Sequence, residues 1–314
     1  MLKMRWASGV LATLLTATTL LAQEPDVARF RVGVDTVSLS ITVLDDDDHL
    51  VTGLPEENFT VYEDGVEQAI QFFAHGELPL KMVILLDVST SMLQKLEMAQ
   101  EAAVGFVEAL TPGDEVQVVE FGSRVLTLVE FTPDFTEAAK AIRATAVEGA
   151  TALYNAVYVS LKDLEAYRSD QLDRRAIVVL SDGNDTKSVL QFEDVKEQAK
   201  KSNILIYAIS LRANKADLKK EKYRNAKYEL DMLAEVSGGT SYAPEKLNDL
   251  SDVYDDILEE LRAQYSIGYV SMNVEQDGKW RHLQILTAEP GTRIRTREGY
   301  YAPRKSRLRR PRPR

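Results

Sequence analysis

The sequence predicts an α/β fold, a doubly wound, mostly parallel sheet inserted in a small β-sandwich-like module that both flanks form together. Three short apolar runs, at 82–86, 176–180 and 204–209, show no alternation with polar residues, which is typical of strands buried on both faces of a parallel sheet. Apolar residues at helical spacing lie between these runs, as crossover helices require. The flanking segments carry strand patterns instead.

The N-terminal flank, residues 30–76, is expected to form strands. Residues 37–43 alternate between aliphatic and hydroxyl side chains, which is the period-two pattern of a half-buried strand. The pair Asp64-Gly65 lies between the segments 60–62 and 69–72 and favours a tight hairpin turn that joins them.

The central segment is expected to alternate strands with helices. The segments 116–121 and 124–129 flank Gly122-Ser123, which predicts one antiparallel hairpin at an edge of the sheet. Helices are predicted where apolar residues recur every three or four positions, at 96–110, 138–146, 153–164 and 250–261.

The C-terminal flank offers three strands, at 265–270, 280–286 and 293–297. Three strands are too few for a core of their own, so we expect them to pair with the N-terminal flank. The predicted division of the chain is a signal peptide at 1–22, the N-terminal half of the β module at 23–77, the α/β domain at 78–264, the C-terminal half at 265–303 and a basic disordered tail at 304–314.

Composition excludes several classes of function. Of 314 residues, 45% are hydrophobic and 28% charged, which is globular composition. Of the 38 basic residues, two lie in 1–22 and seven in 304–314, which leaves 29 against 49 acidic residues in the body of the chain. An acidic body disfavours nucleic acid as a partner. The absence of cysteine excludes disulfides, cysteine-ligated metals and a cysteine nucleophile.

The first 22 residues are expected to direct export. Lys3 and Arg5 precede an apolar stretch from Val10 to Leu21, and Ala22 offers a small residue for cleavage. The protein is therefore expected to be secreted or to reside in the periplasm or cell envelope. If the segment is not cleaved it would serve as a membrane anchor, and the basic tail could add a weak contact with an anionic surface.

Five oxygen-bearing side chains follow predicted strands or precede a helix at one edge of the sheet: Asp87, Ser89, Ser91, Thr151 and Asp182. Ligands of open α/β sheets bind at the carboxyl ends of the strands. Oxygen ligands alone select a hard cation, so Mg²⁺ or Mn²⁺ is expected, with Ca²⁺ possible. Two carboxylates only neutralise the dication, which leaves it able to accept a third carboxylate from outside.

Enzyme functions find little support in the sequence. A serine hydrolase needs a histidine near its serine, yet the histidines are His49, His75 and His282, and His75 precedes the first buried strand, at the opposite end from Asp87. The chain has no GxSxG elbow, HExxH motif, phosphate loop or dinucleotide fingerprint. We therefore expect no catalysis, with metal-dependent hydrolysis as the remaining enzyme alternative.

The five side chains resemble the metal-ion-dependent adhesion site of von Willebrand factor A (VWA) domains. Asp87, Ser89 and Ser91 match the DxSxS motif of that family, Thr151 its threonine loop, and Asp182 its aspartate before glycine. The resemblance implies adhesion or other protein–protein interaction, in which an Asp or Glu carboxylate of the partner completes the metal. A structural or assembly module with a stabilising or empty site is the alternative. Because we expect the loop at the surface, we expect Asp87→Ala to remove the metal and leave the fold intact.

The flanks narrow the resemblance to the VWA-related proteins of acidobacteria. The similarity rests on segments 54–65, 237–239, 265–269 and 297–303. It implies an exported bacterial protein and does not name a ligand.

Overall fold

The computed structural model describes residues 36–76, 78–167, 172–181, 185–211 and 221–304. The predicted signal peptide at 1–22 and the tail after Arg304 lie outside the described residues, as does Asp182. No described helix combines the length and apolar character needed to cross a membrane.

A six-stranded sheet forms the centre of the α/β domain, in the order β10-β9-β8-β5-β6-β7. Its pairs are parallel except β6–β7, which is the edge hairpin that the sequence predicts. All eight residues of β5 are buried, as expected for a run without alternation. The strands are β5 (Leu80–Asp87), β6 (Glu115–Phe121), β7 (Val125–Thr132), β8 (Arg174–Ser181), β9 (Leu205–Ser210) and β10 (Ser241–Tyr242).

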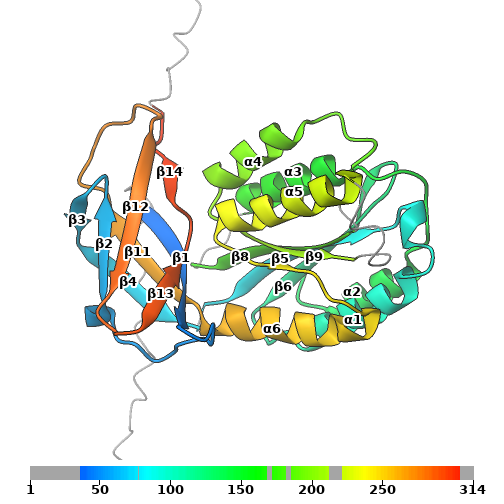
Figure 1. Cartoon of the computed structure of the whole chain (residues 1–314), viewed down its shortest axis with the longest axis horizontal. Helices are drawn as coiled ribbons and strands as arrows, with labels where there is room; N and C mark the ends of the chain where they lie inside the picture. The colour runs from blue at the N-terminus through cyan, green and yellow to red at the C-terminus, as the bar shows by residue number, and fades with distance from the viewer. Residues whose placement is uncertain (1–35, 77, 168–171, 182–184, 212–220, 305–314) are drawn as a thin grey trace, which may run out of the picture. The chain divides into compact units, whose positions relative to one another are not determined.

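Helices cover both faces of this sheet (Figure 1). One core joins α1, α2 and α6 to one face, and a second core joins α3, α4 and α5 to the other. This arrangement confirms the predicted doubly wound α/β class. The helices are α1 (Leu96–Glu108), α2 (Phe135–Ala144), α3 (Leu153–Ala166), α4 (Phe192–Lys201), α5 (Glu221–Ser237) and α6 (Leu250–Ala263).

Two four-stranded sheets form the β module, in the orders β13-β1-β11-β4 and β14-β12-β2-β3. Each sheet combines strands that precede the α/β domain with strands that follow it, and all the strand pairs are antiparallel. The strands are β1 (Thr36–Asp45), β2 (Phe59–Glu63), β3 (Val66–Gln68), β4 (Ile70–His75), β11 (Tyr265–Val270), β12 (Trp280–Thr287), β13 (Thr292–Arg295) and β14 (Gly299–Tyr301).

The hairpin turn at Asp64-Gly65 is confirmed, but its predicted second strand is wrong. Both residues have positive φ, 48° and 79°, as the tight turns favoured in hairpins require. The strand that pairs with β2 across this turn is β3, whereas Ile70 pairs with Tyr269 in the other sheet. The chain therefore crosses between sheets at Ala69, which local periodicity does not reveal.

Buried polar contacts join the β module to the α/β domain. Glu260 of α6 accepts a hydrogen bond of 2.7 Å from the hydroxyl of Tyr207 and forms a 2.5 Å ion pair with Arg295 of β13. Arg297 donates to the main-chain oxygens of Ser38 and Ser202, one on each side.

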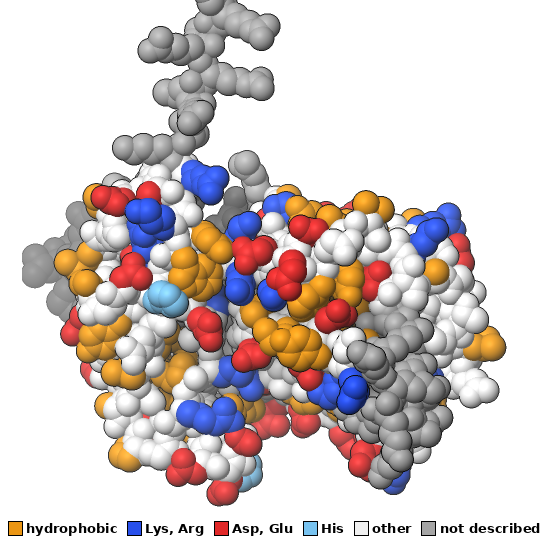
Figure 2. All heavy atoms as spheres, turned by 45° about the horizontal axis from the view of Figure 1, so that its top comes forward, with side chains coloured by type: hydrophobic (Ala, Val, Ile, Leu, Met, Phe, Trp, Pro, Cys, Tyr) orange, Lys and Arg blue, Asp and Glu red, His pale blue; other side chains and the backbone are white. Residues whose placement is uncertain are grey.

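On the face drawn in Figure 2, acidic and basic side chains are interspersed.

Candidate metal centre

Asp87 is the last residue of β5 and lies fully buried. Its Oδ1 accepts the main-chain N–H of Ser89 at 2.8 Å, and its Oδ2 accepts the hydroxyl of Ser181 at 2.5 Å. These bonds fix the carboxylate at the carboxyl ends of two neighbouring strands, β5 and β8. The expectation that Asp87 belongs to a surface loop is therefore wrong, because the strand that carries it is covered on both faces.

Ser89 and Ser91 flank the start of a single 3-10 turn, η2 (Thr90–Met92). Ser89 is the N-cap of this turn and is buried, whereas Ser91 is exposed. Their hydroxyl oxygens lie 3.0 Å apart. The alternate spacing thus brings two neutral oxygen donors to one side of the loop, as predicted.

The loop that carries Thr151 is fastened to the loop after β5. Both the main-chain N–H and the hydroxyl of Thr90 donate to the carbonyl oxygen of Gly149, at 3.0 and 2.8 Å. Gly149 has a φ of 66°, and a Cβ there would lie 2.1 Å from the Ser123 hydroxyl, so only glycine fits without rearrangement. Thr151 follows Gly149 by two residues and is 4% exposed.

The third loop, after β8, contains Asp182, which lies outside the described residues. Its described neighbours on both sides contact the other two loops. Ser181 donates to Asp87, and Thr186 exchanges hydrogen bonds with the main chain of Thr151. The structure therefore brings four of the five predicted residues, and the described residues on either side of Asp182, to one sheet edge.

Sequence reasoning missed the residues that hold this edge together. Asp185 accepts the main-chain N–H of Tyr154, at the start of α3, and that of Ser188. Ser181 binds Asp87, at the start of the loop after β5, and Thr186 binds the main chain of Thr151. The signal for Ser181 was present, since it ends a buried strand beside an aspartate, but hydroxyls at strand ends are common and do not reveal their partners.

The donor set fits a hard divalent cation. Among the described residues, no three or more His, Cys, Asp or Glu side chains gather into a group able to hold a metal ion. The centre would therefore depend on hydroxyls of Ser89, Ser91 and Thr151 together with Asp87 and Asp182. Oxygen donors with few carboxylates suit a small cation that keeps several waters, such as Mg²⁺ or Mn²⁺.

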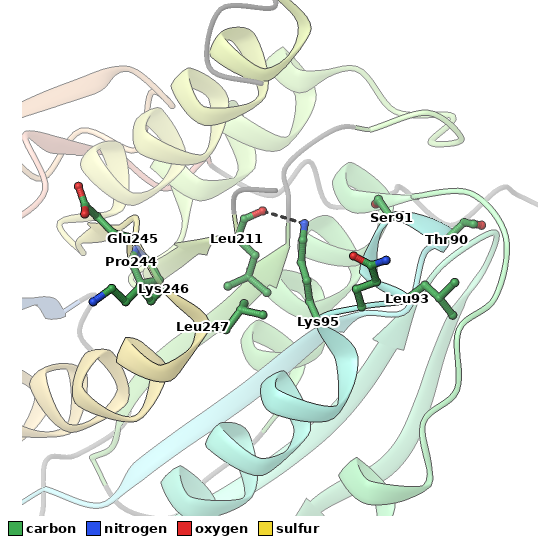
Figure 3. A pocket seen from close by; sticks show the side chains of 10 residues that line it. Thr90, Ser91, Leu93, Lys95, Leu211, Pro244, Glu245, Lys246 and Leu247 are labelled. Carbon is green, nitrogen blue, oxygen red and sulfur yellow. Dashed lines mark hydrogen bonds between the residues drawn. The ribbon is translucent and has the colours of Figure 1, made fainter. Parts of the chain in front are cut away.

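A cavity of about 400 Å³ opens beside Ser91 (Figure 3). Its lining comes from η2 and the start of α1, from Leu211 after β9, and from the segment between β10 and α6. Figure 3 shows Lys95 extending from the start of α1 toward the carbonyl oxygen of Leu211, to which its ammonium donates at 3.2 Å. The cavity thus borders one of the proposed metal ligands directly.

The histidines lie in the β module, away from this edge. His49 follows β1, His75 ends β4 and packs against the ring of Tyr265 with 4.6 Å between centroids, and His282 lies in β12. Because β4 leads into the start of β5, His75 lies at the opposite end of that strand from Asp87. No serine–histidine pair for nucleophilic catalysis forms at the described part of the candidate centre.

Comparison with known proteins gives one family model and several structural neighbours. The model of the von Willebrand factor type A domain matches residues 82–184. A UPF0353 protein of Mycolicibacterium paratuberculosis is 26% identical over 226 residues, which are 66% of this chain and 67% of that protein. A solved von Willebrand factor type A protein from Catenulispora acidiphila has a TM-score of 0.51 at 12% identity. The match covers 87% of this chain and 74% of that protein's chain.

A second solved structure is the vWF domain of the type V pili tip protein Mfa5 from Porphyromonas gingivalis. It has a TM-score of 0.47 at 14% identity and covers 58% of this chain and 94% of its own. At 12% identity the Catenulispora acidiphila structure shows similarity of fold. The narrower resemblance to acidobacterial proteins stays a prediction.

Proposed function

Since residues 82–184 match the model of the von Willebrand factor type A domain, we propose that this chain binds a partner protein through a divalent cation. Domains of this family are often protein-interaction modules. The ligands would be Asp87, Ser89, Ser91, Thr151 and Asp182, and an Asp or Glu carboxylate of the partner would complete the coordination. The observation that carries the proposal is the set of hydrogen bonds at one sheet edge that joins the loop after β5 to the loop of Thr151, and both of them to Ser181 and Thr186.

The loop after β5 and the loop of Thr151 are held to one another before any partner arrives, which favours binding. Thr90 fixes the loop of Thr151 to the loop after β5, and Ser181 fixes Asp87 to the end of β8. A preorganised site loses little conformational entropy when its ligand binds. When bound, Mg²⁺ or Mn²⁺ would supply an electrophile whose charge two carboxylates only neutralise, so a further anionic oxygen is attracted.

Export and the absence of catalysis belong to the same proposal. The charged start and apolar stretch of residues 1–22 support a secretory signal, and hence a partner outside the cytoplasm. The position of the histidines in the β module supports binding rather than hydrolysis. The basic residues after 303 would contribute a weak surface contact at most.

The test is a thermal-unfolding titration of the purified chain with Mg²⁺, Mn²⁺ and Ca²⁺. A cation at about 100 times its dissociation constant stabilises the folded state by ~2.7 kcal/mol, which raises the melting temperature by several degrees. Asp87→Asn should lose this shift, while Asp134→Asn, at the N-cap of α2, should keep it. Equal shifts in the wild-type protein and Asp87→Asn would contradict the proposed site.

A second candidate function is a structural or assembly module. One observation favours it, because both carboxylate oxygens of Asp87 already accept hydrogen bonds from protein donors. On this alternative Asp87 holds the ends of β5 and β8, and a partner binds elsewhere. Partner capture that survives a chelator would support the structural alternative over the metal-dependent one.

A further inference from the structure

The cavity beside Ser91 lies where a partner's residues next to the metal-bound carboxylate would reach. Ser91 lines the cavity, and its hydroxyl lies 3.0 Å from that of Ser89. The cavity is therefore adjacent to two of the oxygen atoms proposed to hold the cation. The side chains that line the cavity set which side chain of a partner it accepts.

The charge of the cavity differs from that of the chain that surrounds it. Its lining includes Lys95 and Lys246 against one acidic residue, Glu245. The body from 23 to 303 has 29 basic against 49 acidic residues, so most of its surface repels an acidic partner. An acidic segment is thus favoured at this cavity over the rest of the acidic body.

The position of Lys95 places positive charge inside the cavity rather than at its mouth. This lysine is 7% exposed, at the N-cap of α1. A charge in a partly desolvated position acts on a neighbouring ion more strongly than an exposed one does. Lys246 is exposed and would act mainly on the approach of the partner.

Apolar side chains form another part of the wall. Leu93, Leu211, Pro244 and Leu247 all line the cavity, and Leu93 is 68% exposed. Such walls suit the methylene groups of a side chain whose charged end meets Lys95. Glutamate combines an aliphatic stem with a terminal carboxylate, whereas aspartate is shorter by one methylene.

We propose that the cavity is a subsite for a glutamate side chain of the partner. It would lie one or two residues from the Asp or Glu that completes the metal, so that the recognised element is a short acidic segment of a protein. This inference rests on the proposed metal-dependent function and specifies its partner.

The test uses a library of random heptapeptides displayed on phage, panned on the purified full chain in Mg²⁺ and eluted with a chelator. The expected result is enrichment of sequences with two acidic residues, one of them glutamate. In a synthetic copy of an enriched peptide, Glu→Gln at the second acid should weaken binding about fivefold or more. Lys95→Met and Lys246→Glu should weaken binding of the same peptide, and the matched surface variant Lys140→Glu should not.

Three results would overturn the inference, each in its own way. Enrichment of sequences with a single acidic residue beside an apolar one would show that the cavity takes an aliphatic side chain. Unchanged peptide affinity in Lys246→Glu and Lys95→Met, with the Mg²⁺ thermal shift intact, would remove the cavity from recognition and leave the metal function standing. Enrichment of the same sequences in a parallel selection without Mg²⁺, eluted with acid, would contradict the proposed function and this inference together.

Discussion

The hydroxyl of Ser181 donates a 2.5 Å hydrogen bond to Oδ2 of Asp87, so the ends of β8 and β5 are joined through the carboxylate proposed to serve the metal. Asp87 is fully buried and also accepts the N–H of Ser89. Asp87 therefore has a structural contact to lose in addition to any metal contact. Replacements of Asp87 by alanine and by asparagine distinguish the structural role from the role in metal binding.

Asp87→Ala should destabilise the protein as well as remove the metal response. Alanine leaves the Ser181 hydroxyl and the Ser89 N–H without their acceptor in a buried position, at a cost of about 1–3 kcal/mol for each unsatisfied group. Chemical denaturation without added metal measures this loss. Asp87→Asn keeps one acceptor oxygen and should lose less stability, although it too should lose the Mg²⁺ shift.

Unchanged stability in both variants would argue against this geometry. If Asp87→Ala and Asp87→Asn unfold at the same denaturant concentration as the wild-type protein, the hydrogen bonds to Ser181 and Ser89 contribute nothing measurable. Asp47→Ala, in the exposed turn after β1, serves as a control for loss of a carboxylate that is remote from the sheet edge.

Thr90→Val should weaken metal binding with little loss of stability. The hydroxyl of Thr90 fastens the loop of Thr151 to that of Ser89 through the carbonyl of Gly149, and the main-chain N–H of the same residue keeps a second bond. Because Thr90 is exposed and its main-chain bond remains, we expect the unfolding free energy to fall by only about 0.5 kcal/mol. The Mg²⁺ concentration at half-maximal thermal shift should rise.

The matched control is Thr52→Val, an exposed threonine of the β module. It should leave both the stability and the midpoint of the Mg²⁺ titration unchanged. A normal midpoint in Thr90→Val would show that the second loop holds its position without this hydroxyl.

Local patterns predicted those parts of the fold that local forces decide. The apolar run that became β5 signalled burial on both faces, and Asp64-Gly65 signalled a tight turn because that turn needs two positive φ angles. The strand change at Ala69 depends on pairing with Tyr269, about two hundred residues away, so no local pattern could show it.

At the candidate centre, the sequence points to the candidate ligand residues but not to the contacts that hold them. The spacing of Asp87, Ser89 and Ser91 is a local feature of one loop. The burial of Lys95 is not, since a lysine at the start of a helix is ordinarily solvated and this one is covered because the end of β9 comes close to it. Contacts between loops of different strands follow from tertiary packing.

Glu260→Gln should destabilise the chain by about 2 kcal/mol. The carboxylate of Glu260 accepts from the hydroxyls of Tyr207 and Thr240 and pairs with Arg295 of the β module. Removing one partner of a largely buried ion pair leaves the other uncompensated, and the partial exposure of Arg295 moderates the cost. Urea denaturation gives the change, and the exposed neighbour Glu259 provides the control in Glu259→Gln, which should be neutral within about 0.5 kcal/mol.

Tyr300 should make the protein sensitive to alkaline pH. Burial, and then the hydrogen bond that its hydroxyl donates to Glu63 at 2.9 Å, raise the pKa of Tyr300 to about 12. A pKa that is higher in the folded state contributes stability that is complete below the unfolded value near 10 and is lost as the pH rises through 12. The unfolding free energy should therefore fall between these pH values.

Tyr300→Phe should show a shallower fall than the wild-type protein over the same range, and a lower stability at pH 7 because Glu63 loses one donor. Denaturation curves at a series of pH values measure both effects. Tyr228→Phe, at a tyrosine that is 61% exposed on α5, should keep the wild-type slope. Parallel slopes for the wild-type protein and Tyr300→Phe would mean that ionisation of Tyr300 does not differ between the folded and unfolded states.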